Sequence, residues 1–189
     1  MRAKFLVIMG PSGVGKSTVM QRLSELDARF VKVKNHVTRP LRPGETERVS
    51  MPLSKLKEMR ERGEVTQINH IYGDYYAALP KKMINEAMRA GMFPMVDYKI
   101  PFLAELKVEF PGKIFSVYLL PPNFSIIRSR LMKAGRQVEK NRIEEDEREA
   151  SSLDSRYAGL IDLRLVNEEG KVGRVAEEIR KAITLRRKP

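Results

Sequence analysis

A glycine-rich stretch near the N-terminus, GPSGVGKST at residues 10–18, has the composition and spacing of a phosphate-binding loop. Gly10, Gly13 and Gly15 let the backbone turn at positive φ and approach an anion closely. The backbone N–H groups then point inward at the start of a helix, where partial positive charge favours an anion. Lys16 adds a mobile charge for terminal phosphates, and the Ser17 hydroxyl can ligate Mg²⁺. The residues expected to contact ATP are Gly10, Pro11, Ser12, Gly13, Val14, Gly15, Lys16, Ser17 and Thr18.

Two arginines further along the chain are suited to a second phosphate. Arg39 and Arg42 lie three residues apart, each followed by a proline, in a segment that is too stiff to form a helix. Two planar guanidinium groups that converge on one phosphate make charge-assisted, bidentate contacts. Tyr76 could donate its hydroxyl to the same oxygens. This pattern predicts a site for a phosphorylated acceptor.

The loop and the arginines need a scaffold, and the hydrophobic pattern predicts one. Runs typical of buried strands occur at residues 4–9, 30–34, 92–97, 113–120 and 161–166, mostly separated by helical patterns. Such alternation predicts an α/β fold with a parallel sheet and helices on both faces.

The chain of 189 residues is expected to form one domain in three parts. The core comprises residues 1–34, 81–131 and 153–189. Residues 35–80 are rich in turn residues, contain one short helix around 54–62, and are predicted to form an inserted lobe. Residues 132–152 are dense in charge and are predicted to be helical beyond their glycine, as a lid.

Composition excludes some chemistries and indicates others. There is no cysteine, which excludes disulfides, thiolate metal sites and a cysteine nucleophile. No apolar run approaches the length of a membrane span, so we expect a cytoplasmic protein without a membrane partner. The net charge of +12 is spread along the chain without a stacking pattern of aromatic residues. We therefore expect it to attract nucleotides, and nucleic-acid binding is not expected to be the main function.

The order of these motifs resembles the guanylate kinase family over nearly the whole chain. The phosphate loop is followed by T-R-x-x-R-x-G-E, Gly63-Glu64, Y-G-x-Y-Y, a strand that ends in L-P-P, an arginine-bearing lid, and a last strand and helix. The resemblance implies a P-loop NTPase-type sheet, a lobe that binds a nucleoside monophosphate, and a helical lid. It also implies phosphoryl transfer from ATP, with Mg²⁺, to a nucleoside monophosphate such as GMP or dGMP.

The resemblance also implies roles for residues of the lid and the sheet. Arg142 matches the lid arginine, Arg130 begins the lid, and Arg136 is expected to substitute for the arginine that the family has where Ala134 stands. Asp97 ends a strand and is expected to orient Mg²⁺-bound water, with a simple strand-end cap as the alternative. The expected catalytic residues are Lys16, Arg39, Arg130, Arg136 and Arg142, and the expected metal-site residues are Ser17 and Asp97.

The departures from the family cluster in the lobe and affect the identity of the acceptor. Gln67 replaces the glutamate that accepts from guanine, and an amide offers a donor where a carboxylate offers acceptors only. Ala78 replaces a hydroxyl, and Lys99 replaces an acid. A tyrosine after the R-x-x-R-x-G-E element is missing, and Ser50 is expected nearby. The expected acceptor-binding residues are Asn35, Arg39, Arg42, Ser50, Gln67, Tyr76 and Ala78.

Three interpretations therefore remain open at the level of sequence. The first is a guanylate kinase with altered base contacts. The second is a kinase of the same fold for another nucleotide or a ribose bisphosphate. The third is a guanylate-kinase-like binding module without catalysis, against which the intact Lys16, Ser17, Arg39 and Arg42 argue. The choice between ribo and deoxy acceptors, and between monomer and homodimer, is open as well.

Overall fold

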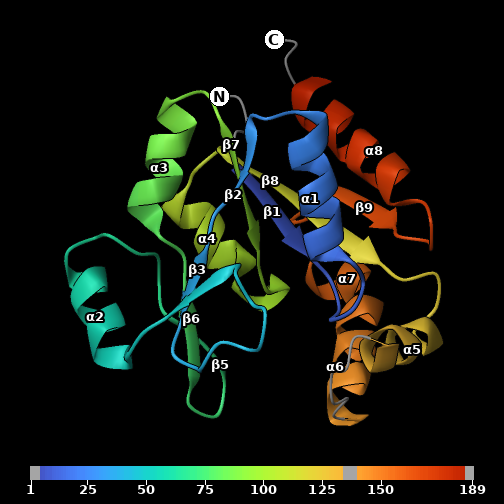
Figure 1. The fold of residues 1–189 in the computed structure, drawn as a ribbon, viewed down its shortest axis with the longest axis horizontal. Helices are drawn as coiled ribbons and strands as arrows, with labels where there is room; N and C mark the ends of the chain where they lie inside the picture. The colour runs from blue at the N-terminus through green and yellow to red at the C-terminus, as the bar shows by residue number, and fades with distance from the viewer. Residues whose placement is uncertain (1–4, 134–139, 186–189) are drawn as a thin grey trace.

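A computed structural model of the chain describes residues 5–133 and 140–185. Its central sheet has five strands in the order β2-β7-β1-β8-β9 (Figure 1). All neighbouring strands in it are parallel. The strands are β1 (Phe5–Met9), β2 (Phe30–Lys32), β7 (Phe93–Asp97), β8 (Ile114–Leu120) and β9 (Leu163–Val166). The five strands that the hydrophobic runs predict are confirmed, with ends that shift by one or two residues.

Helices cover both faces of this sheet, as the sequence predicts. The helices α1 (Lys16–Leu26) and α8 (Val172–Leu185) pack side by side on one face (Figure 1). The other face is covered by α3 (Lys81–Arg89), α4 (Leu103–Glu109) with the short 3₁₀ turn η1 (Ile100–Phe102), and α7 (Leu153–Arg156). Along β1, Leu6 and Ile8 enter one core, and Phe5 and Val7 enter the other. A strand buried on both faces is continuously apolar, which explains the run FLVIM.

A second, smaller sheet lies beside the first at the lower left of Figure 1. Its order is β4-β3-β6-β5, with β3 (Asn35–Val37), β4 (Arg48–Ser50), β5 (Asn69–Tyr72) and β6 (Tyr75–Ala78). The helix α2 (Leu53–Glu61) closes a separate small core around Leu56 and Val65. We call residues 35–80 the acceptor lobe. Its helix confirms the sequence prediction, whereas its strands are too short to give a periodic signal. The exact boundaries of the lobe and the lid remain a prediction.

Two helices follow β8 and lie near the carboxyl end of the central sheet (Figure 1). They are α5 (Ser125–Lys133) and α6 (Lys140–Ser151). The second confirms the helix predicted beyond the glycine of the charged segment. Ile143 and Asp146 are its buried residues among those whose side chains the structure describes. Within the described ranges, no helix is both long and apolar enough to cross a membrane.

Candidate active site

The phosphate loop joins β1 to α1, and its backbone admits no side chain at two positions. Gly10 has φ +134°, and a Cβ there would lie 2.3 Å from the carbonyl oxygen of Leu119. Gly15 has φ +100°, and a Cβ there would lie 2.6 Å from Asn167 Nδ2. Asn167 Nδ2 in turn donates to the carbonyl oxygen of Val14 at 2.7 Å. The loop is therefore held by Asn167, which directly follows β9, and lies close against Leu119 of β8.

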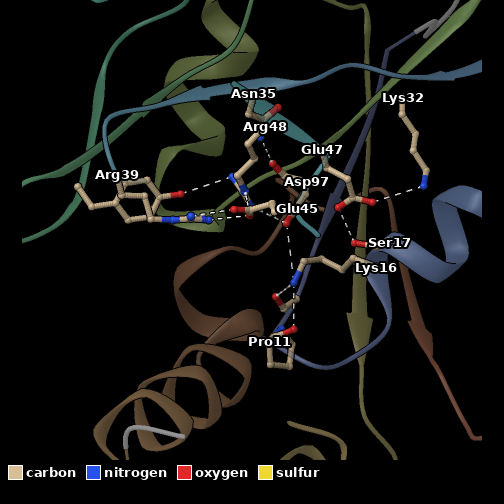
Figure 2. Close-up of polar contacts among 12 residues, drawn as sticks. Pro11, Lys16, Ser17, Lys32, Asn35, Arg39, Glu45, Glu47, Arg48 and Asp97 are labelled. Carbon is tan, nitrogen blue, oxygen red and sulfur yellow. Dashed lines mark hydrogen bonds and ion pairs between the residues drawn. The ribbon is translucent and has the colours of Figure 1, made fainter. Parts of the chain in front are cut away.

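Lys16 lies at the centre of the loop and folds back over it (Figure 2). Its Nζ donates to the carbonyl oxygens of Gly10 at 2.7 Å and Pro11 at 3.0 Å, and lies 3.8 Å from Asp97 Oδ1. Burial lowers the pKa of the Lys16 ammonium, and the charge of Asp97 opposes that shift. The positive charge is thus placed at the mouth of the loop, where the terminal phosphates of a bound nucleotide would lie.

The hydroxyl of Ser17, expected at the metal site, is bound to a residue of the acceptor lobe. Ser17 Oγ donates to Glu47 Oε2 at 2.8 Å, and Lys32 Nζ lies 3.4 Å from Glu47 Oε1. Glu47 and Asp97 line the same cleft as Ser17. Mg²⁺ prefers oxygen ligands and keeps waters and phosphate oxygens in its shell, so this donor set fits the ion. Glu47 has no local signal that would single it out in the sequence, because Ser17 is 30 residues away.

One cleft runs from the phosphate loop to the acceptor lobe, and many of the predicted residues line it. It brings together Gly10, Ser12, Gly13, Gly15, Lys16, Ser17, Thr18, Asn35, Arg42, Ala78, Asp97 and Arg130. Other predicted residues are not among the described residues that line it, namely Pro11, Val14, Arg39, Ser50, Gln67 and Tyr76. Most of the loop residues therefore line the cleft, with Pro11 and Val14 as exceptions, and the other differences lie in the lobe.

Arg39 is bound by a carboxylate of its own loop. Its Nη1 and Nη2 donate to Glu45 Oε2 and Oε1 at 2.8 and 2.7 Å, and its guanidinium lies 5.3 Å from the centre of the Tyr75 ring. The hydrogen bonds from Arg39 are the main cause that lowers the pKa of Glu45 to about 2. The backbone N–H of Arg42 also donates to Glu45, and Arg42 lines the cleft. Both arginines thus contact Glu45, Arg39 through its guanidinium and Arg42 through its backbone, and their convergence on one phosphate stays a prediction.

A third arginine, which the sequence analysis missed, lies in the cleft between the lobe and the core (Figure 2). Arg48 Nε donates to Glu45 Oε1 at 3.1 Å, Nη1 to the Tyr75 hydroxyl at 3.4 Å and Nη2 to Asp97 Oδ2 at 3.2 Å. It stands in the segment where the expected tyrosine is missing. The missing tyrosine was the only sign in the sequence that this segment differs, and it pointed to the hydroxyl of Ser50 and not to Arg48.

The two adjacent tyrosines of the lobe point in different directions. Tyr75 lines the cleft, whereas the Tyr76 ring packs 4.9 Å from that of His70. Successive side chains of a strand alternate between its faces, so a shift of one residue exchanges the two. The sequence analysis proposes Tyr76 as a contact to the acceptor phosphate, and that role stays a prediction; of the two tyrosines, Tyr75 is the one among the described residues that line the cleft.

Two asparagines supply polar groups to the lobe side of the cleft. Asn35 is buried and donates through Nδ2 to the carbonyl oxygen of Asp97 at 2.7 Å, while its Oδ1 has no hydrogen-bond partner among the described residues. Asn69 is also buried, and its Nδ2 donates to the Tyr98 hydroxyl at 2.7 Å. Burial raises the pKa of Tyr98, which keeps this hydroxyl protonated. Asn69 and Tyr98 were not predicted, because amide and phenol groups form no recognisable motif.

Two residues predicted to bind the acceptor lie on the outside of the lobe. Gln67 is exposed, and its backbone N–H donates to Glu109 Oε1 at 2.7 Å. Ser50 is also exposed, and its Oγ donates to the carbonyl oxygen of Arg39 at 2.8 Å. Ala78, in contrast, is buried and lines the cleft.

The lid arginines are described only in part. Arg130 lines the cleft, and its Nη1 and Nη2 lie 3.5 and 3.4 Å from the carbonyl oxygen of Asn167. Arg136 and the side chain of Arg142 lie outside the part that the structure describes. The lid helix α6 contributes a buried carboxylate instead, since Asp146 Oδ2 accepts the backbone N–H of Ser12 at 2.9 Å.

A phosphate loop between the first strand and helix of a parallel sheet, with a lobe and helices around the cleft, defines a P-loop fold of the kind found in kinases. Solved structures agree: a shikimate kinase from Acinetobacter baumannii has a TM-score of 0.53 at 13% identity, covering 99% of this chain and 96% of that one. A guanylate kinase from Anaplasma phagocytophilum reaches 0.76 at 19% identity, covering 100% and 88%. Likeness at these identities establishes the fold alone.

Sequence comparison then assigns the family. The guanylate kinase family model matches residues 2–183, and the chain belongs to this family of nucleoside monophosphate kinases. The guanylate kinase of Porphyromonas gingivalis is 28% identical over 187 residues, covering 95% of this chain and 96% of that protein. That of Streptococcus pyogenes serotype M3 is 29% identical over 189 residues, covering 96% and 85%. The resemblance that the motifs predict is thereby confirmed.

Proposed function

We propose that this chain transfers the γ-phosphoryl group of ATP to GMP or dGMP, which yields ADP and GDP or dGDP. The observation that carries the proposal is the single cleft with two sets of phosphate-binding groups. Lys16 and the loop lie at one end, beside Asp97, and Arg42 of the predicted arginine pair lines the cleft on the lobe side. Membership in the guanylate kinase family supports the choice of acceptor.

The proposed chemistry needs positioning and charge neutralisation more than covalent help. The acceptor phosphate is already ionised near neutral pH, so the transfer requires no dedicated general base. Lys16 and the loop N–H groups hold the donor phosphates, while the lobe arginines hold the acceptor in line. Mg²⁺ would neutralise charge on the donor, with Ser17 as a ligand and Asp97 orienting its waters.

The lid arginines are proposed to act when the site closes. Arg130 already lines the cleft beside the loop, and Arg136 and Arg142 belong to the segment that would cover it. Closure excludes water, which would otherwise hydrolyse ATP, and strengthens the electrostatic contacts to the transferring group. Arg39 would support this site through Glu45.

A panel of acceptors tests this proposal. ADP release from ATP is measured with GMP, dGMP, AMP, UMP, CMP and a ribose bisphosphate, with the Lys16→Ala variant as the control for transfer. We expect kcat/KM for GMP or dGMP to exceed that of every other acceptor by at least about tenfold, since a site built for one pattern of hydrogen bonds rejects the others. A higher value with another acceptor would overturn the choice of GMP. If no phosphoryl group is transferred to any of these acceptors, the chain is a guanylate-kinase-like binding module without catalysis.

A further inference from the structure

Arg48 is one of the lobe residues that reach the core beside the phosphate loop, and it does so through its guanidinium (Figure 2). Its side chain is 20% exposed and lines the cleft. Asp97, which accepts from Arg48 Nη2 at 3.2 Å through Oδ2, also lies 3.8 Å from Lys16 Nζ through Oδ1. One carboxylate therefore links the guanidinium of Arg48 to the ammonium that serves the donor phosphates.

The orientation of Arg48 is set from the lobe. Glu45 Oε1 accepts from both Arg39 Nη2 at 2.7 Å and Arg48 Nε at 3.1 Å, so one carboxylate aligns two guanidinium groups. The Tyr75 ring lies against Arg39, and its hydroxyl accepts from Arg48 Nη1. These contacts hold Arg48 by its Nε edge and direct its two Nη groups toward the cleft. A guanidinium presented in this way matches the two oxygens of a phosphate.

We propose that Arg48 binds the phosphate of the acceptor, and that Asp97 and the Tyr75 hydroxyl take the place of this phosphate in the free protein. On binding, the two Nη groups pass from Asp97 and Tyr75 to phosphate oxygens, while Nε stays on Glu45. Asp97 is then released toward the donor side of the cleft, where Lys16 lies. This inference rests on the proposed function, since it assigns a residue to the acceptor of that transfer.

A purely structural role for Arg48 is the alternative, in which the arginine only joins the lobe to the core through Asp97. The two roles differ in what a substitution does to different ligands. A structural role predicts equal effects on a nucleotide and on the nucleoside without the phosphate. A phosphate-binding role predicts that only the nucleotide is affected.

The experiment measures binding of GMP and of guanosine by calorimetry, without ATP, to the wild type, Arg48→Gln and Arg48→Lys. The matched control is Arg62→Gln, an arginine of the same lobe whose side chain is 49% exposed and pairs with Glu64. We expect Arg48→Gln to weaken GMP binding about 10- to 100-fold, as for a lost charge-assisted contact, with guanosine binding within about twofold of the wild type. Arg48→Lys keeps the positive charge but loses the planar guanidinium that can bind two phosphate oxygens, and it should weaken GMP binding by roughly three- to tenfold.

The GMP-to-guanosine affinity ratio decides the outcome, and turnover of GMP by the wild type is measured alongside it. A ratio in Arg48→Gln that stays at the wild-type value overturns the inference, whether both affinities are kept or both fall together. If Arg48→Gln does not fold, Arg48→Lys decides by the same ratio. If the wild type turns over GMP and the ratio in Arg48→Gln equals the wild-type ratio, only this inference is contradicted and the proposed function stands. A wild type that neither binds nor turns over GMP contradicts the proposed function as well.

Discussion

The backbone N–H of Ser12 donates to Asp146 Oδ2 at 2.9 Å, which joins the phosphate loop to the lid helix α6 across 134 residues of sequence. Asp146 is 4% exposed, and Lys99 Nζ lies 3.6 Å from its other oxygen. A buried carboxylate is stable when a charge and a hydrogen-bond donor both compensate it. Helix α6 is therefore attached to the phosphate loop through a polar contact.

The first prediction concerns this contact. Asp146→Ala should lower the free energy of unfolding by about 1–3 kcal/mol, because the Ser12 N–H loses its partner in a partly buried position. The measurement is urea denaturation, with Glu145→Ala, an exposed carboxylate of the same helix, as the control. Equal losses for both variants would show that the Ser12 bond contributes nothing to stability.

The second prediction concerns Lys16. Lys16→Ala should lower kcat by about a hundredfold or more, because its ammonium is placed where charge develops on the transferring group. The far-ultraviolet circular dichroism spectrum should not change. Lys181→Ala is the control, since that side chain is 61% exposed on α8. A Lys16→Ala variant that retains activity within a fewfold of the wild type would contradict a catalytic role for the loop.

The third prediction is a pH dependence of stability that originates at Glu45. Its pKa is about 2 in the folded protein against 4.5 ordinarily, chiefly because Arg39 donates to it. The folded state thus disfavours the protonated form. This contribution is present above about pH 4.5 and is lost as the pH falls toward 2. The stability advantage of the wild type over Glu45→Gln should shrink by about 1–2 kcal/mol between pH 6 and pH 3. Urea denaturation at a series of pH values measures this difference. If the difference in stability stays constant from pH 6 to pH 3, Glu45 does not form this ion pair with Arg39 in solution.

The fourth prediction separates two candidates for contact with the base. Asn69→Ala should lower kcat/KM for GMP about tenfold, because Asn69 is buried in the lobe and lines the cleft with Tyr98. Gln67→Glu should change it by less than about threefold, because Gln67 is exposed and outside the lining. Steady-state kinetics with GMP at saturating ATP, together with melting temperatures, provide the measurement. A tenfold gain in Gln67→Glu with a neutral Asn69→Ala would return base recognition to Gln67.

The sequence by itself determined the features that depend on neighbours in the chain. The glycines of the phosphate loop are required by positive φ and close backbone approach at Gly10 and Gly15, which are local steric demands. The five core strands follow from continuous apolar runs, and the helix of the lobe follows from a local pattern of apolar residues. Together with the order of the motifs, these features were sufficient to identify the family.

Only the tertiary structure decided which polar side chains share the cleft. Arg48, the first residue of β4, reaches Asp97, and Glu47 directly before it reaches Ser17. Adjacent residues on a strand point to opposite faces, so composition and spacing could not tell which of Tyr75 and Tyr76 lines the cleft. Contacts of this kind join residues 30 to 49 positions apart in the sequence, and their geometry depends on how the second sheet packs beside the first.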